Sequence, residues 1–256
     1  MKNKFTILGC GSSLGSPWIT DFWGKCDKNN IKNLRTRCAA HIQYKNLSIL
    51  IDTSPDIKLQ FKNNKLNNVD AVIYTHEHAD QASGIFELRP FFWKNKKKIP
   101  AYGSPRTMKE LKDKYTYCFF PRYGYKPIMK SITIKKKFKI KKGNNHLNVT
   151  PFDVEHGLIN ATGYMFDKVA YISDCNYISN KSMKYLYELD YLVIDCLRMK
   201  THPSHFNYDA AINFINKVKP KKAILTNLHV DLDYKILSKI LPSNVSAAYD
   251  GLSFNF

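Results

Sequence analysis

The segment Thr75-His76-Glu77-His78-Ala79-Asp80 places two imidazoles and two carboxylates within six residues. It directly follows the apolar, β-branched run at 69–74, which is typical of a strand. Side chains two positions apart in extended backbone point to the same side, so His76 and His78 can reach one cation. The segment therefore predicts a metal site at the end of a strand.

Length and composition favour a globular chain. With 256 residues and 44% hydrophobic content, the sequence can bury a large core, and no low-complexity linker or repeat divides it. We interpret residues 1–256 as a single domain. No apolar run approaches the roughly 20 residues that a membrane helix needs, Met1-Lys-Asn-Lys is not followed by the apolar core of a signal peptide, and the six cysteines form no C-x-x-C pair. The sequence predicts a reduced, cytoplasmic protein without a membrane partner. A homodimer is one of the assembly states that the sequence allows.

The formal charge of +19 raises the question of a nucleic-acid partner, since basic surfaces bind phosphate by releasing counterions. Only six of the 40 basic residues are arginine, and Lys is accompanied by many Asn and Ile, the pattern of an AT-rich coding bias. The lysine runs at 94–98 and 135–142 are interpreted mainly as solvated surface. Nucleic acid is therefore retained as a partner but not favoured.

Apolar and β-branched runs alternate with fewer helical patterns, which indicates a mixed α/β chain. The expected strands are 5–8, 48–52, 69–74, 99–102, 132–134, 147–154, 161–166, 169–173, 191–195, 223–226 and 247–254. The expected helices are 81–91, 106–119, 180–189, 208–218 and 234–241. The aromatic and basic stretch 91–130 fits either a loop over a site or a surface excursion packed on its own rings.

Three more ligand-type side chains follow expected strands. His156 comes after 147–154, Asp174 after 169–173, and His229 after 223–226. Functional loops gather at the ends of strands, so these residues are candidates for the same site as His76 and His78.

This ordered set resembles the metallo-β-lactamase superfamily over nearly the whole chain. The motifs that carry the resemblance are Asp52, His76-x-His78-x-Asp80, His156, Asp174 and His229. The resemblance implies a four-layer αββα sandwich. It also implies a first metal held by His76, His78 and His156, and a second held by Asp80 and His229 with Asp174 bridging both.

The implied cofactors are two divalent ions, Zn or Mn. Two such ions lower the pKa of a bridging water and stabilise both oxygens of an in-line displacement, so a bridging hydroxide is the expected nucleophile. Asp52 is expected to orient a ligand imidazole without binding the metal itself. The alternative is that Asp52 is only a turn residue at a strand end. Members of the superfamily usually have the motif H-x-H-x-D-H, whereas this chain has Gln81 in place of the last histidine. An amide is a weaker ligand than imidazole, so the second metal site is expected to be the weaker one.

The segment from Arg198 to Ala211 contains His202-Pro-Ser-His205 and resembles the phosphodiesterase branch of the superfamily. The resemblance assigns catalytic roles to Asp80 and His205, with His205 contacting phosphate and protonating the leaving oxygen. His202 is a second candidate for substrate contact. The alternative for His205 is a capping residue at a helix entry.

The opening segment 8–17 resembles that of ribonuclease Z and of the phosphoribosyl cyclic phosphodiesterases. Leu14 occupies a position where a dinucleotide-binding loop needs glycine, so we expect a turn that lines the rim of the site. Two features of those relatives are absent from the sequence. The spacing between His156 and Asp174 is too short for a tRNA-binding arm, and Cys26 stands alone where a zinc-binding cysteine cluster is common.

The sequence thus favours a metal-dependent phosphodiesterase that hydrolyses a small cyclic or nucleotide-like phosphate ester. One alternative is an RNA nuclease of ribonuclease Z type that uses the basic region 91–142 to bind its substrate. The other is a non-hydrolytic protein in which Gln81 has weakened the second metal site and the pocket only binds a ligand.

Overall fold

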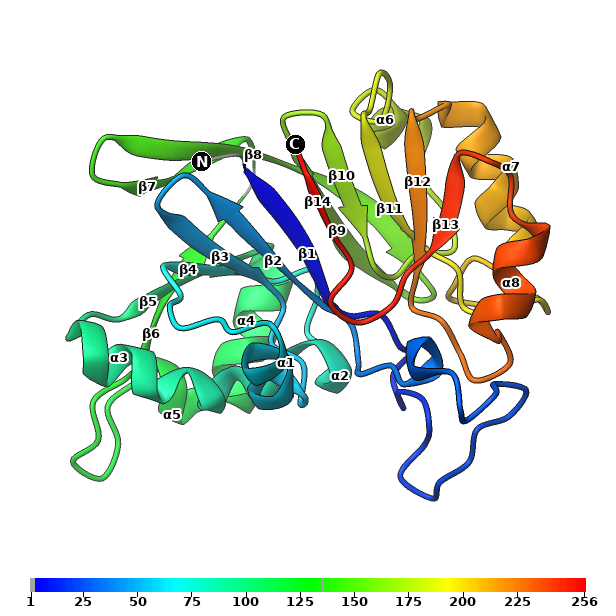
Figure 1. The fold of residues 1–256 in the computed structure, drawn as a ribbon. Helices are drawn as coiled ribbons and strands as arrows, with labels where there is room; N and C mark the ends of the chain where they lie inside the picture. The colour runs from blue at the N-terminus through cyan, green and yellow to red at the C-terminus, as the bar shows by residue number, and fades with distance from the viewer. Residues whose placement is uncertain (1–2, 135) are drawn as a thin grey trace.

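Two facing β-sheets form the centre of the computed structural model, which describes residues 3–134 and 136–256 (Figure 1). The strands of the first sheet are β1 (Lys4–Gly9), β2 (Ala39–Tyr44), β3 (Leu47–Ile51), β4 (Ala71–Ile73), β5 (Ile99–Gly103), β6 (Met129–Thr133) and β14 (Ser253–Asn255). They lie in the order β14-β1-β2-β3-β4-β5-β6. The strands from β3 to β6 are parallel neighbours, whereas β1 pairs antiparallel with β2 and with β14.

The second sheet runs from a long hairpin into a parallel half. Its strands are β7 (Phe138–Lys142), β8 (Asn145–His156), β9 (Ile159–Phe166), β10 (Val169–Ile172), β11 (Tyr191–Asp195), β12 (Lys222–Thr226) and β13 (Val245–Ala247). They lie in the order β13-β12-β11-β10-β9-β8-β7, and β10 to β13 are parallel.

Helices cover the outer face of each sheet. On the first sheet lie α1 (Ile57–Asn63), α2 (Ala79–Ala82), η2 (Ser83–Leu88), α3 (Arg89–Asn95), α4 (Pro105–Lys114) and α5 (Thr116–Phe119). On the second lie α6 (Asn180–Met183), α7 (Tyr208–Val218) and α8 (Tyr234–Ile240), while η1 (Ile31–Asn33) belongs to the loop after β1. Among the described residues, no helix combines the length and the apolar character needed to cross a membrane.

The alternation of side chains along β3 shows how the layers pack. Leu47, Ile49 and Ile51 are buried between the two sheets, whereas Leu50 is buried on the other face beneath α1 and η2. Both faces of the strand are thus covered, which explains why four of its five residues are apolar. The arrangement helix, sheet, sheet, helix confirms the predicted αββα sandwich.

Several element boundaries differ from the predicted ones. β2 and β7 were not predicted, because Ala39 and Ala40 give β2 a weak apolar signal and lysines dilute the alternation of Phe138 and Ile140 in β7. β7 is the last strand of its sheet, and lysines on such an edge oppose pairing with another chain. The predicted helix 81–91 is divided into α2, η2 and α3, and 180–189 is helical only in α6.

The predicted strand 247–254 is two strands in different sheets. β13 ends at Ala247 in the second sheet, and β14 begins at Ser253 in the first. Gly251 lies between them at φ +87°, a conformation that favours glycine, and the chain crosses there from one sheet to the other.

Candidate active site

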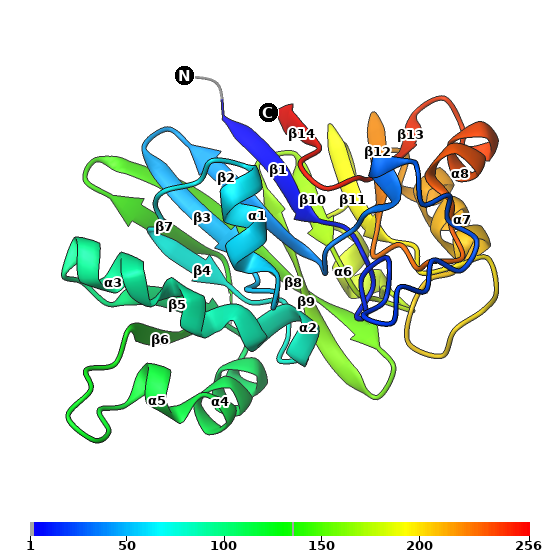
Figure 2. The same cartoon turned by 60° about the horizontal axis from the view of Figure 1, so that its bottom comes forward.

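The parallel strands bring the candidate residues to one edge of the sandwich. β3 and β4 are neighbours and end at Ile51 and Ile73, just before Asp52 and the metal-binding segment. β10, β11 and β12 are likewise neighbours, and their ends carry Asp174, Asp195 and Asn227. Figure 2 shows α2 and the loop after β1 on the side of the molecule that is turned forward. Residues that are far apart in the sequence therefore converge, as expected from the sequence.

Three histidines form the centre of the site. One ligand nitrogen from each of His76, His78 and His156 lies within 4.8 Å of the others. Nε2 of His156 is 3.3 Å from Nδ1 of His78, and the ring centroids of His76 and His78 are 4.5 Å apart. Three converging imidazoles are a common ligand set for zinc and related ions.

His76 has the protonation state that a metal ligand requires. The Thr75 hydroxyl donates to Oδ2 of Asp52 at 2.8 Å, and it lies 3.0 Å from Nδ1 of His76, whose proton it can accept. Burial lowers the pKa of His76 to about 3, so the ring is neutral at pH 7. Among the described residues, its buried Nε2 has no hydrogen-bond partner. A free lone pair is thus held toward the other two rings, which fits a divalent ion.

Asp52 therefore acts on His76 through Thr75 and not by direct contact. The carboxylate also accepts the backbone N–H of Thr75 at 2.8 Å, and it is fully buried. Its backbone has φ 63°, a conformation that few residues other than glycine adopt. Asp52 thus combines both roles considered for it, a turn at a strand end and the orientation of a ligand.

His156 is oriented by a backbone carbonyl. Its Nδ1 lies 2.7 Å from the Ser204 carbonyl oxygen, which can only accept a hydrogen bond. Nδ1 therefore carries the proton, and Nε2 is left to bind an ion next to His78. Such hydrogen bonds behind a histidine fix both its tautomer and its orientation.

Two carboxylates and Gln81 lie beside the histidines. Burial and the nearby Asp174 carboxylate raise the pKa of Asp80 to about 6. For Asp174, burial raises the pKa, but the rings of His76, His205 and His156 outweigh it and lower the pKa below its usual value. The Gln81 amide donates to Oδ2 of Asp174 at 3.2 Å and approaches Oδ2 of Asp80 at 3.5 Å. Gln81 thus contacts both carboxylates of the expected second metal site through its nitrogen.

His229 lies in the same cavity but farther from the histidine centre. Its Nδ1 is 3.1 Å from a carboxylate oxygen of Asp231, and Trp18 contacts the ring edge-on. Neither His229 nor Asp80 belongs to the groups of ligand atoms that lie within 4.8 Å of one another. The first metal site is therefore compact, and the residues expected to complete the second are more widely spaced.

His205 forms a charged pair with Asp195 next to this centre. Nδ1 of His205 is 2.8 Å from Oδ2 of Asp195, and the His205 ring lies 4.7 Å from that of His156. Burial lowers the pKa of His205, but the carboxylates of Asp195, Asp174 and Asp80 outweigh it and raise the pKa to about 9. Burial raises the pKa of Asp195 only to about 6, so the pair is ionised at pH 7. His205 thus holds a proton beside the histidine centre.

The cavity at this edge has a volume of about 320 Å³. His202 lies on its wall, where its Nδ1 is 3.2 Å from the Ser204 hydroxyl. Ser12, Ser13 and Leu14 line the opposite rim, which confirms the prediction that the opening segment forms a turn at the site. The stretch 91–130 contributes no residue to the lining, so it is not a loop over this cavity.

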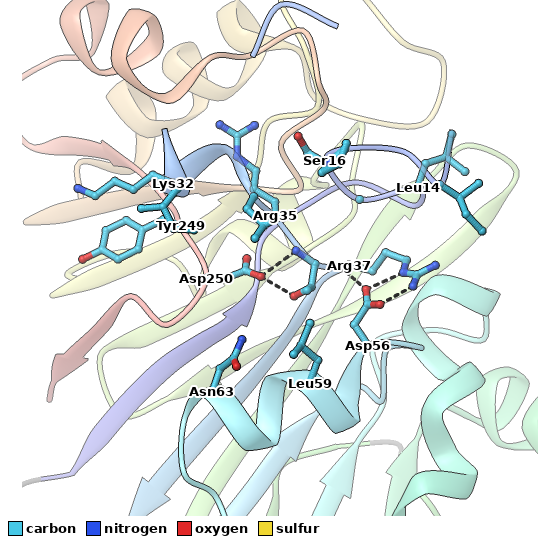
Figure 3. Close-up of a pocket in the computed structure, with 16 residues that line it drawn as sticks. Leu14, Ser16, Lys32, Arg35, Arg37, Asp56, Leu59, Asn63, Tyr249 and Asp250 are labelled. Carbon is cyan, nitrogen blue, oxygen red and sulfur yellow. Dashed lines mark hydrogen bonds and ion pairs between the residues drawn. The ribbon is translucent and has the colours of Figure 1, made fainter. Parts of the chain in front are cut away.

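A second hollow of about 580 Å³ shares Leu14 with the lining of the metal cavity (Figure 3). Arg37 and Asp56 form an ion pair on its wall, and Asp250 accepts from the Thr36 backbone N–H at 2.7 Å. Burial raises the pKa of Asp250 to about 6.

Arg35 lies near the lone Cys26, where related enzymes often have a cysteine cluster. It is 2% exposed, and its guanidinium donates to the carbonyls of Leu232 at 2.7 Å and His229 at 3.3 Å. It also donates to Oδ1 of Asn33 at 3.1 Å and contacts the Cys26 thiol at 3.9 Å. A buried guanidinium therefore ties the loop after β1 to the segment that carries His229.

Four contributors to the site were not identified from the sequence: Asp195, Thr75, Ser204 and Glu77. Asp195 is an acid at the end of an apolar strand, the same pattern that pointed to Asp174, so this signal was available. Glu77 is buried and pairs with Arg106 at 3.0 Å, which ties the metal-binding segment to α4. Ser204 orients His156 through its backbone carbonyl, which every residue type has, so its side chain gave no signal for this role.

Comparison with known proteins agrees with this geometry. A family model described as a β-lactamase superfamily domain matches residues 48–227. A crystal structure of a diphosphatase from the PhnP family is 30% identical, with a TM-score of 0.89 over 100% of this chain and 98% of that one. Zn²⁺-bound PqqB from Methylobacterium extorquens has the same fold, with 16% identity, a TM-score of 0.79 and coverage of 99% of this chain and 100% of that one.

A curated octanoyltransferase from Porphyromonas gingivalis is 30% identical over 251 residues, which is 96% of this chain but 50% of that protein. The chain thus spans about half the length of this relative. Together the fold, the histidine centre and these matches define the class. The chain belongs to the β-lactamase superfamily and has the metallo-β-lactamase fold.

Proposed function

We propose that the protein is a metal-dependent phosphodiesterase for a small cyclic or nucleotide-like phosphate ester. The observation that carries the proposal is the position of His205, held by Asp195, beside the centre formed by His76, His78 and His156. Two divalent ions, Zn or Mn, would activate water and offset negative charge on the phosphate when bound. The neighbouring structure is named a diphosphatase, which by that name cleaves a diphosphate, and its 30% identity supports a phosphate-containing substrate for this chain.

The residues of the chain have separate roles in binding the metals and in proton transfer. His76, His78 and His156 would hold the first ion, while Asp80, Asp174 and His229 would hold the second. His205 contacts the phosphate and gives its proton to the leaving oxygen, which is worth about 10²- to 10⁴-fold in rate for a placed general acid. Asp195 keeps His205 protonated and oriented. A cavity of about 320 Å³ suits a small substrate.

The name octanoyltransferase supports no acyl transfer in this chain. That name describes a protein of which this chain matches 50%, so the named activity can reside in the other half. Among the described residues, no cysteine lines the metal cavity, and burial raises the pKa of the nearby Cys175 thiol well above its usual value. The six cysteines are free thiols, in agreement with the cytoplasmic location that we propose.

Substrate selectivity tests the proposal. Metal-loaded protein is given bis(p-nitrophenyl) phosphate, p-nitrophenyl phosphate and an octanoyl thioester at equal concentrations. We expect the diester to be the preferred substrate by kcat/KM. Preference for the thioester would contradict the proposal, and binding of metal without turnover of any ester would favour the non-hydrolytic alternative.

A further inference from the structure

A third recess lies outside the metal cavity, between α3, the start of β5 and the loop before β6. It has a volume of about 760 Å³ and is lined by Arg89, Phe92, Trp93, Lys96, Lys98 and the residues 124–127. We call this set the aromatic-basic surface. It shares no lining residue with the metal cavity, and among the described residues no carboxylate lines it. The metal site does not account for it.

The exposed apolar side chains around this recess are all aromatic. Within the range 86–125 the large hydrophobic residues left exposed are Phe86, Trp93, Phe120, Tyr123 and Tyr125. Trp93 is 52% exposed and Tyr125 is 49% exposed. The aliphatic residues of the same range, such as Leu88 and Leu111, are fully buried. The surface thus presents flat rings and no protruding aliphatic chain.

Arg89 holds three of these rings around one positive charge. Its guanidinium carbon lies 4.7 Å from the centroid of Trp93, 5.1 Å from that of Tyr125 and 5.6 Å from that of Phe86. Tyr117 stacks on Phe86 at 5.3 Å from the outer side. Cation–π contacts of this kind fix the rings in place, so their exposed faces are ordered before any ligand binds.

The charge around the rings is positive and uncompensated. Among the described residues, Lys96, Lys98 and Lys126 form no ion pair, and all three are exposed. The sequence has no acidic residue from 88 to 109 or from 114 to 152, although it has 21 elsewhere. A ligand for this surface must therefore carry negative charge and flat apolar groups.

We propose that the aromatic-basic surface binds single-stranded nucleic acid, with bases stacked on Trp93 and Tyr125 and phosphates beside Lys96, Lys98 and Lys126. Nucleic acid without sequence preference is bound by this combination of exposed rings and a basic groove. An anionic membrane is the other polyanion that attracts such charge, but a recess of about 760 Å³ with rings on its wall suits a flat base that enters it better than a planar lipid surface. The proposal does not depend on the chemistry of the metal site.

Fluorescence anisotropy with a labelled oligouridylate of about 12 nucleotides, added to the metal-loaded protein, tests the proposal. We expect binding that weakens about 10-fold in Trp93→Ala and in Tyr125→Ala, because each loses one stacked base. Trp93→Phe should retain most of the affinity. Lys96→Glu with Lys98→Glu should reduce the slope of log K against log salt by about 1.4, since two phosphate contacts are lost.

Matched controls distinguish this site from general charge attraction. Lys217→Glu with Lys239→Glu makes the same charge change on α7 and α8, which lie at the opposite end of the molecule from α3 in Figures 1 and 2. Tyr187→Ala removes a ring that is 54% exposed elsewhere. Unchanged binding in both controls supports the proposal. Equal losses in the controls, no binding of the oligonucleotide at low salt, or binding of phosphatidylserine vesicles in its place would overturn it.

Discussion

Nδ1 of His205 lies 2.8 Å from Oδ2 of Asp195, a carboxylate that is completely buried at the end of β11. The Cys175 backbone N–H donates to the same oxygen at 2.9 Å, and the Asn227 amide donates to the other oxygen at 3.0 Å. Asp195 is therefore held rigidly and faces His205 with its charge. Because the fold holds this buried carboxylate next to His205, it favours the protonated form of the His205 ring.

Asp195→Asn keeps the shape of the side chain but removes its charge. His205 must be protonated to donate, so activity falls as the pH rises through its pKa, which is raised to about 9. Loss of the carboxylate lowers that pKa and should move the alkaline fall of kcat to lower pH, with kcat itself reduced about 10-fold or more. The pH profile of kcat measures both effects, and metal content should be unchanged. An unchanged alkaline limb would show that His205 is not the acid.

Gln81→His restores the imidazole that the superfamily usually has at this position. Because imidazole is a better ligand for zinc than an amide, we expect the second equivalent of metal to bind about 10-fold more tightly. Calorimetric titration with Zn²⁺ measures the two affinities separately. Gln81→Asn is the matched control and should give no gain. If Gln81→His also gives none, the second site is not limited by this residue.

Arg35→Met should destabilise the protein by about 3 kcal/mol, because it leaves the buried Leu232 carbonyl without a donor and removes the hydrogen bonds to Oδ1 of Asn33 and to the His229 carbonyl. Arg37→Met is the control two residues away. Arg37 is 30% exposed and pairs with Asp56, so about 1 kcal/mol is expected there. Urea unfolding measures both free energies. Equal values for the two variants would refute a special role for the buried guanidinium.

His41 should make the fold sensitive to acid. Burial lowers its pKa from 6.5 to about 4, so in this range the unfolded chain binds a proton that the folded chain does not. The free energy of unfolding then falls as the pH drops from about 6.5 toward 4, by up to about 3 kcal/mol. In His41→Gln this loss is absent, so the stability difference from the wild type should shrink between pH 7 and pH 5. Urea unfolding at both pH values checks this, and a constant difference would contradict it.

The candidate site residues that the structure brings together share one signal in the sequence, a polar ligand-type side chain directly after an apolar strand. His76, His156 and Asp174 follow this rule. The strands β4 and β10 end at this edge beside parallel neighbours, whereas His156 is the last residue of β8, which pairs antiparallel with β9. Asp195 obeys the same rule but was assigned only to its strand. Arg35 could not be found this way, since its role depends on carbonyls near His229, almost 200 residues later in the chain, and no local pattern encodes such a contact.

The boundaries of helices and strands were less predictable because they too depend on contacts between residues that are far apart in the sequence. β7 is an edge strand rich in lysine, and its hydrophobic alternation is weak because only Ile140 is fully buried in it. The split between β13 and β14 depends on Gly251 and on which sheet each half joins, which is decided by packing across the whole molecule. Local propensity does not contain that information.

The central claim is that metal held by the three histidines hydrolyses phosphodiesters. The most direct measurement is turnover of bis(p-nitrophenyl) phosphate by wild type and His76→Ala, each stripped of metal and reloaded with Zn²⁺ or Mn²⁺, with bound metal determined on the same samples. We predict that the wild type gains activity on reloading, whereas His76→Ala retains at least one metal fewer and loses activity by about 100-fold or more. Equal metal content and equal turnover in the two proteins would contradict the account.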